Sequence, residues 1–116
     1  MTLQEQQTEV FLDCLDCVSA MIHQNARDKG FYETPPNDLE RFALMHSEIS
    51  EACEGVRHGN PASEHIPNFS AVEEEMADTI IRILDYSVYR GLHIGEAILA
   101  KHEFNKTRPH RHGKTC

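Results

Sequence analysis

Residues 70–91, SAVEEEMADTIIRILDYSVYRG, decide the fold. Ser70 and Glu73 have the spacing of a capping box, in which the two side chains satisfy free N–H groups at a helix start. Apolar residues then recur at helical spacing on more than one stripe, and Gly91 is a suitable end. A helix that is apolar around so much of its circumference packs between several neighbours. We expect some of those neighbours to come from another copy of this chain.

The same signals predict three further helices. The first covers residues from about 2 to 28, before Gly30, and the second begins after Asn37, which has the residue type of a helix N-cap. The last covers residues from about 94 to 107 and ends before Pro109. The connecting segments contain paired turn formers and prolines, and no strand pattern or repeat is present. The sequence therefore predicts one all-α domain over residues 1–116, a four-helix bundle that oligomerises through its helices.

The charge distribution separates an acidic body from a basic end. The net charge is -8, yet residues 101–116 contain five lysines and arginines and only one acidic residue. This balance argues against nonspecific binding of nucleic acid. Residues 109–116 are expected to form a flexible basic tail. An acidic body next to a basic end suits a cation and a polyanion bound at one place.

No stretch of the sequence predicts export or a membrane span. The first residues lack a basic segment followed by an apolar run, and no apolar segment approaches the roughly 20 residues that cross a bilayer. The four cysteines are then expected to be reduced thiols. We expect a cytoplasmic protein with no membrane partner.

Two pairs of acidic residues stand on consecutive predicted helices. Glu48 and Glu51 are three positions apart, and so are Glu75 and Asp78, so each pair shares one helix face. If the two helices are antiparallel, the four carboxylates converge across one seam. Such a cluster takes up protons unless cations neutralise it, and oxygen ligands suit hard cations such as Mg²⁺. Ordinary surface glutamates on amphipathic helices remain the alternative at this point.

The acidic pattern and the stretches around it resemble those of the MazG-like, all-α nucleoside triphosphate pyrophosphohydrolases. The resemblance includes ALMHSEISEACEGVRHGNP (residues 43–61), FSAVEEEMADTIIRILD (69–85) and AKHEFNKTRPHRHGK (100–114), and it covers roughly residues 23–114. It implies hydrolysis of a (d)NTP to the (d)NMP and pyrophosphate, which in this family clears the nucleotide pool of surplus or noncanonical nucleotides. It also implies a homodimer, or a tetramer built from dimers.

The resemblance assigns roles to individual residues. The metal ligands are Glu48, Glu51, Glu75 and Asp78, holding Mg²⁺ or Mn²⁺, and Glu51 with Glu48 acts on the attacking water. The basic end supplies contacts to phosphate and sugar from Lys101, Asn105, Lys106, Arg108, His112 and Lys114. Arg82 either pairs with Asp85 or joins the site. His23 and Tyr32 (or Phe31) stand where relatives contact the base, although short relatives have a tryptophan near Tyr32 and this chain has none.

Other functions remain open. A non-catalytic helical module that binds a nucleotide or a protein would show the same helices. An all-α dUTPase or a phosphoribosyl-ATP pyrophosphohydrolase would share the helical logic with a different substrate. Two other kinds of site are excluded or disfavoured, because the chain has no Gly-rich P-loop and no Glu-x-x-His pair of a di-iron bundle.

Overall fold

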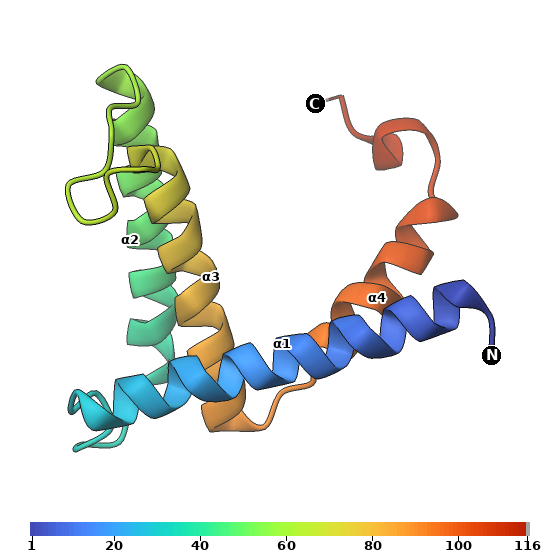
Figure 1. The fold of residues 1–116 in the computed structure, drawn as a ribbon. Helices are drawn as coiled ribbons and strands as arrows, with labels where there is room; N and C mark the ends of the chain where they lie inside the picture. Colours follow the sequence, from blue (N-terminus) through green and yellow to red (C-terminus); the bar gives the residue numbers. More distant parts are fainter. Residues whose placement is uncertain (116) are drawn as a thin grey trace.

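The computed structural model describes residues 1–115, and Cys116, the last residue of the predicted tail, lies outside them. The described chain forms four α-helices and a short C-terminal turn, drawn in Figure 1. The helices are α1 (Leu3–Asp28), α2 (Asp38–Arg57), α3 (Ala71–Arg90) and α4 (Ile94–Lys106), followed by the 3₁₀ turn η1 (His110–Gly113). Apart from one isolated bridge between Ala62 and Ser70, the described chain has no extended pairing. The prediction of an all-α protein with four helices is confirmed.

The helix ends are fixed by the residues that the sequence pattern indicates. Ser70 and Glu73 form the predicted capping box at the start of α3, and the side chain of Asn37 accepts a hydrogen bond from the Glu40 N–H at the start of α2. Gly91 ends α3 in the left-handed conformation, which glycine adopts without strain. A second capping box, Thr2 with Glu5, begins α1.

Two helix pairs hold the chain together at a wide angle to each other. α2 and α3 lie antiparallel, and α1 crosses the end of this pair and packs on α3 (Figure 1). α4 packs against the N-terminal half of α1 and leads away from α2. A Cβ atom added at Gly95 would lie 2.8 Å from a methyl group of Leu12 and 3.2 Å from one of Leu15, so only glycine permits this approach of α4 to α1.

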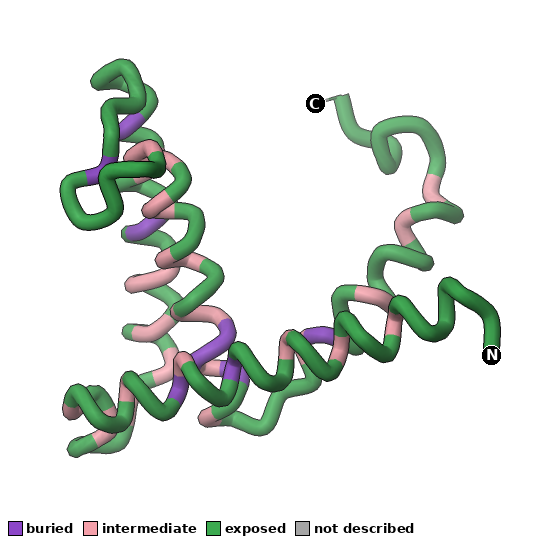
Figure 2. The backbone as a smooth tube through the Cα atoms, in the orientation of Figure 1, coloured by how far each residue is buried: buried purple, intermediate pink, exposed green. Residues whose placement is uncertain are grey.

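A single chain buries almost no apolar core. Leu84 is the only buried apolar residue in the described chain, and green, exposed backbone dominates Figure 2. Met76, Ile80 and Ile81 of α3 are about half exposed, at 53%, 55% and 43%. The accessible surface is 8782 Å², against roughly 6,400 Å² for a compact monomer of this mass. The radius of gyration is 16.9 Å, against about 13.4 Å for a compact domain of this length. The helices are therefore incomplete without further apolar surface.

None of the helices combines the length and the apolar content that crossing a bilayer demands, within the part of the chain that the structure describes.

Candidate metal centre and adjoining pocket

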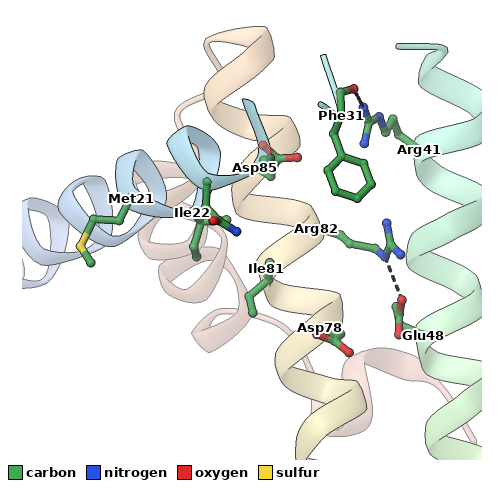
Figure 3. Close-up of a pocket in the computed structure, with 11 residues that line it drawn as sticks. Met21, Ile22, Phe31, Arg41, Glu48, Asp78, Ile81, Arg82 and Asp85 are labelled. Atoms are coloured by element: carbon green, nitrogen blue, oxygen red, sulfur yellow. Dashed lines mark hydrogen bonds and ion pairs between the residues drawn. The ribbon is translucent and has the colours of Figure 1, made fainter. Parts of the chain in front are cut away.

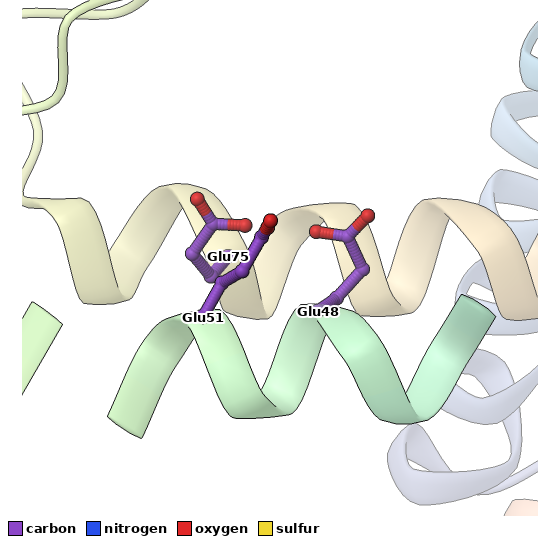
Figure 4. A group of neighbouring side chains, drawn as sticks. All are labelled: Glu48, Glu51 and Glu75. Carbon is purple, nitrogen blue, oxygen red and sulfur yellow. The ribbon is translucent and has the colours of Figure 1, made fainter. Parts of the chain in front are cut away.

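Three carboxylates meet on one side of the α2–α3 pair. Glu48 and Glu51 rise from α2 and Glu75 rises from α3, as Figure 4 shows. One oxygen from each lies within 4.8 Å of the others. Glu48 is buried, Glu75 is half-buried and Glu51 is exposed, so the cluster opens to solvent on the Glu51 side. The antiparallel arrangement expected from the sequence therefore brings these three residues together.

Close contact between the two helices explains this convergence. Gly55, one turn after Glu51, faces the start of α3, where a Cβ atom at position 55 would touch Ala71 and Val72 at 3.4 Å. Because no side chain separates the backbones here, α2 and α3 approach closely near the acidic residues. The three-residue spacing within each helix then points the carboxylates into the same seam.

Asp78, the fourth predicted ligand, belongs to a second group that shares Glu75. Oxygens of Glu74, Glu75 and Asp78 also lie within 4.8 Å of one another. Glu74 was not predicted from the sequence. It is one of three consecutive glutamates, Glu73–Glu75, and the spacing of acidic residues does not distinguish between them. Glu74 accepts hydrogen bonds from Ser63 and from Nδ1 of His65, which ties the α2–α3 loop to α3.

Protonation differs among these carboxyl groups. Burial, together with the neighbouring Glu48 and Glu51, raises the pKa of Glu75 to about 8. Burial and the charges of Glu48 and Glu74 also raise the pKa of Asp78. Burial alone would raise the pKa of Glu48, but hydrogen bonds from Arg82 and from Glu75 outweigh it and hold that pKa below its usual value. Without a cation, the cluster therefore holds a proton on Glu75.

The donor set fits a hard divalent cation. Oε2 of Glu75 is occluded and has no hydrogen-bond partner among the described residues, although it lies next to two other carboxylates. An occluded acceptor without a donor is unfavourable, and a cation would satisfy it. Oxygen-only ligands at the edge of an open site suit Mg²⁺, which keeps several waters or substrate oxygens in its shell. Glu48, Glu51, Glu75 and Asp78 are the residues that would hold it.

Arg82 is the charged partner of the cluster. Its Nε donates a hydrogen bond of 2.9 Å to Oε1 of Glu48. The sequence left open whether Arg82 pairs with Asp85 or joins the candidate site. Among the described residues, Arg82 pairs with Glu48, one of the candidate metal ligands, and not with Asp85. Its guanidinium remains about one-third exposed and lines the pocket next to the acidic residues (Figure 3).

A pocket of about 480 Å³ adjoins the acidic cluster between α1, α2 and α3. Figure 3 shows its apolar side formed by α1 and the loop after it, and its charged side by α2 and α3. Its lining comprises Met21, Ile22, Asn25, Ala26, Phe31, Arg41, Glu48, Asp78, Ile81, Arg82 and Asp85. A mainly apolar cavity with a few charged groups at one end is typical of a site for a small, partly charged molecule.

His23 lies behind this pocket and has no free ring nitrogen. Its Nδ1 lies 2.8 Å from Oδ1 of Asp85, and Nε of Arg27 donates to its Nε2, also over 2.8 Å. These contacts require the tautomer with the proton on Nδ1. His23 is 8% exposed. The structure therefore places this predicted base contact in a position that orients Asp85, which does line the pocket.

Of the two aromatic residues predicted near the base, Phe31 lines the pocket and Tyr32 does not. The Tyr32 ring stacks on Tyr89 at 5.0 Å and meets the edge of His23 at 4.8 Å. Burial and the neighbouring Asp85 raise the pKa of Tyr32 to about 12. Phe31, in contrast, is 60% exposed, so its ring is available to a ligand.

The predicted phosphate contacts of α4 and η1 are not brought to the cluster by their own chain. Figure 1 shows α4 and the C-terminal turn beside the N-terminal half of α1, whereas α2 and α3 stand beside its C-terminal end. Lys101 and Arg108 lie over the Phe104 ring, and Lys106 pairs with Glu103. The remaining predicted contacts on this segment are Asn105, His112 and Lys114.

Pocket residues Asn25 and Arg41 were not found by sequence reasoning. Asn25 is a lone polar residue near the end of α1, and Arg41 looks like any charged residue in the first turns of α2. Arg41 donates to the carbonyl of Phe31 over 3.0 Å and so joins the α1–α2 loop to α2.

Comparisons with protein families, curated proteins and solved structures find no match for this chain.

Proposed function

We propose that this chain is a Mg²⁺-dependent nucleoside triphosphate pyrophosphohydrolase that converts (d)NTPs to (d)NMPs and pyrophosphate in nucleotide-pool house-cleaning. The observation that carries the proposal is the junction of the acidic cluster with the 480 Å³ pocket. A nucleoside fits the apolar part of the pocket, and its phosphates then reach the carboxylates. A surface cluster of glutamates would have no such cavity beside it.

In this proposal each residue of the site has a distinct role. Glu48, Glu51, Glu75 and Asp78 hold the metal. When bound, Mg²⁺ supplies charge neutralisation for the phosphates and acidifies bound water. Arg82, already in the pocket, contacts phosphate oxygens, for which its planar fork is suited.

Glu51 is the residue that acts on the attacking water. It is the exposed member of the cluster, so water reaches it without opening the helix pair. The water oxygen bonds to the α-phosphorus, its proton passes to the Glu51 carboxylate, and the bond from the α-phosphorus to the bridging oxygen breaks. Pyrophosphate leaves with that oxygen.

The active assembly contains more than one chain, as a dimer or a dimer of dimers. The exposed apolar residues of α1 and α3 and the surface excess over a compact monomer support this part of the proposal. Association completes the four-helix bundle that a single chain leaves open. It also allows α4 of one chain to bring Lys101, Lys106 and Arg108 to the phosphates bound by another.

Pyrophosphate release from a panel of nucleotides tests the proposal. The panel contains the four dNTPs, the four NTPs, dUTP and phosphoribosyl-ATP, each with Mg²⁺, with Mn²⁺ and with EDTA. We expect turnover that needs the metal and yields the monophosphate. Preference for dUTP or phosphoribosyl-ATP would assign one of the related activities. If metal-replete protein hydrolyses none of them, the proposal of an enzyme is refuted, and a non-catalytic binding module is the alternative that stays.

A further inference from the structure

The outer side of α2 has a mostly apolar stripe that its own chain leaves largely uncovered. Its positions alternate three and four residues apart, which is the heptad spacing of helices that pack side by side. The stripe, called the α2 seam below, consists of Leu39, Phe42, His46, Ile49, Cys53 and Val56.

The exposed fractions of the seam residues are higher than those of residues that pack in a hydrophobic core. Leu39 is 78% exposed and Val56 65%, while Phe42 and Ile49 are 45% and 47% exposed. His46 and Cys53 are also exposed.

Between its two ends the stripe contains no acidic residue, lysine or arginine, and Asp38 and Arg57 stand just beyond those ends. Glu48 and Glu51 lie on other sides of the helix, with Glu51 almost opposite the seam at 100° per residue. A helix face that meets water ordinarily carries the charges. The distribution on α2 is the reverse, so the seam is a contact surface.

We infer that the α2 seam packs against the α2 seam of a second copy of this chain, antiparallel across a two-fold axis. In that arrangement two residues face each other across the axis when their residue numbers add up to 95. Leu39 then meets Val56, and the large Phe42 meets the small Cys53. His46 meets Ile49. Every layer joins side chains whose combined size is similar, whereas a parallel pair would set Phe42 on Phe42 and Cys53 on Cys53.

The helix dipoles favour the same orientation, because an antiparallel pair opposes them. The charges at the two ends of α2 are already paired within the chain, Asp38 with Arg90 and Arg57 with Glu54, so the contact leaves neither of these end charges without a partner. The flanking positions near the centre are small, Ala43 and Ser50, so the two backbones can approach closely.

The area requirement is also met. The chain exposes about 2,400 Å² more than a compact monomer of its mass, and an obligate homodimer hides roughly 1,000–2,500 Å² per chain. The α2 seam accounts for part of this excess, and the apolar residues of α1 and α3 account for the rest.

The seam has a bearing on the acidic cluster without being part of it. Clamping α2 from behind fixes the helix that carries Glu48 and Glu51. The two clusters of a seam-joined pair lie on opposite outer sides of the paired helices, and neither is covered by the contact. The inference does not depend on the proposed activity, because its test measures association and not turnover.

Site-directed cross-linking tests the seam. The background is the full chain with Cys14, Cys17 and Cys116 replaced by serine, which leaves Cys53. Into it we introduce Phe42→Cys, oxidise at low protein concentration with a copper catalyst, and count covalent dimers on a denaturing gel. We expect most of the protein to form a dimer through positions 42 and 53, because residues in one layer come within disulfide distance.

Two controls keep the result specific. With Cys53 alone no covalent dimer is expected, because the two Cys53 residues of an antiparallel pair are about 16 Å apart along the helices. Glu40→Cys, on the same helix but off the seam, should also remain monomeric on the gel. Since Phe42 also packs on Tyr86, the double change His46→Cys, Ile49→Cys with Cys53→Ser provides an independent layer.

The outcomes separate the seam from its rivals. Dimers from Cys53 alone would show a parallel contact and overturn the proposal. A folded protein that gives no dimer with either layer, or that sediments as a monomer at micromolar concentration, would overturn it as well. Helical circular dichroism of each variant shows that it is folded. Loss of nucleotide hydrolysis would leave this result unchanged, so the two proposals fail separately.

Discussion

Arg82 and Glu48 connect α3 to α2 through a hydrogen bond of 2.9 Å at the wall of the pocket. The carboxylate of Glu48 is 10% exposed and the Arg82 side chain 32%, so water competes little for the acid and more for the base. This pair supplies the charge that lets Glu48 stay ionised beside Glu75.

Arg82→Ala should lower the free energy of unfolding by about 1–3 kcal/mol in the absence of Mg²⁺, because it leaves a buried carboxylate without its partner. Urea denaturation followed by circular dichroism measures this loss. Adding Glu48→Gln to Arg82→Ala should recover part of it. Equal stability of Arg82→Ala and the wild type would show that the pair contributes nothing.

The metal-free protein should lose stability as the pH rises from about 4.5 to about 8. The folded pKa of Glu75 is raised to about 8 from an ordinary 4.5, so the folded state binds a proton more tightly than the unfolded chain. The corresponding stabilisation is complete below pH 4.5 and disappears as Glu75 ionises. Thermal unfolding in EDTA across this range measures the effect.

Glu75→Gln is the control for that pH dependence, and it should flatten the profile between pH 4.5 and 8. Mg²⁺ should oppose the loss in the wild type and do little in Glu75→Gln. Titration calorimetry at pH 7 in buffers of different ionisation enthalpy should show proton release on Mg²⁺ binding. A profile of the same slope in both proteins would contradict the role given to Glu75.

Glu51→Ala should abolish pyrophosphate release and leave the fold intact or slightly more stable without metal, because it removes carboxylate repulsion. The matched control is Glu54→Ala, one turn away on α2, where Glu54 pairs with Arg57 in solvent. That variant should retain wild-type turnover. Activity in Glu51→Ala at saturating Mg²⁺ would remove Glu51 from the site.

His23→Ala should destabilise the protein by about 1–3 kcal/mol, because Asp85 and Arg27 both lose a hydrogen-bond partner in a buried place. Denaturation of His23→Ala and of His23→Gln, which keeps polar atoms in the gap, measures the difference. The glutamine should lose less. Changed nucleotide affinity with unchanged stability would instead make His23 a direct contact.

Gly95→Ala should destabilise the contact between α1 and α4 by about 1–3 kcal/mol, although alanine is normally the better helix former. The reason is the 2.8 Å approach of the added Cβ to Leu12. Glu96→Ala, exposed on the next position, should change stability by less than about 1 kcal/mol. A stabilised Gly95→Ala protein would show that α4 is free to move off α1.

The sequence predicted the helices well because their ends are local features. The expected start of α3 at Ser70 and its end at Gly91 are confirmed, since a capping box and a left-handed glycine act within a few residues. The end of α4 differs from the expected residue 107 by one position. The capping box at Thr2 was present in the sequence and was not used.

The arrangement of the helices could not be predicted in the same way. The sequence of α4 alone does not predict that it packs on α1 and not on α2 and α3. That packing depends on the contact between Gly95 and Leu12, which are far apart in sequence. The pairing of His23 with Asp85 joins residues 62 positions apart. Glu48, Glu51 and Glu75 lie together because consecutive helices joined by a single loop, residues 58–70, pack antiparallel, whereas Asp78 falls in a second group with Glu74 and Glu75.

Leu84 is the only buried apolar residue among residues 1–115, and this bears on the kind of reaction by which the chain folds. In the proposed dimer, the chain gains most of its hydrophobic stabilisation when two molecules meet, so we expect folding to be second order in protein. The midpoint temperature of thermal unfolding then rises with protein concentration, and refolding becomes slower when the protein is diluted. For such a dimer, the total concentration of the protein sets the fraction of it that is folded.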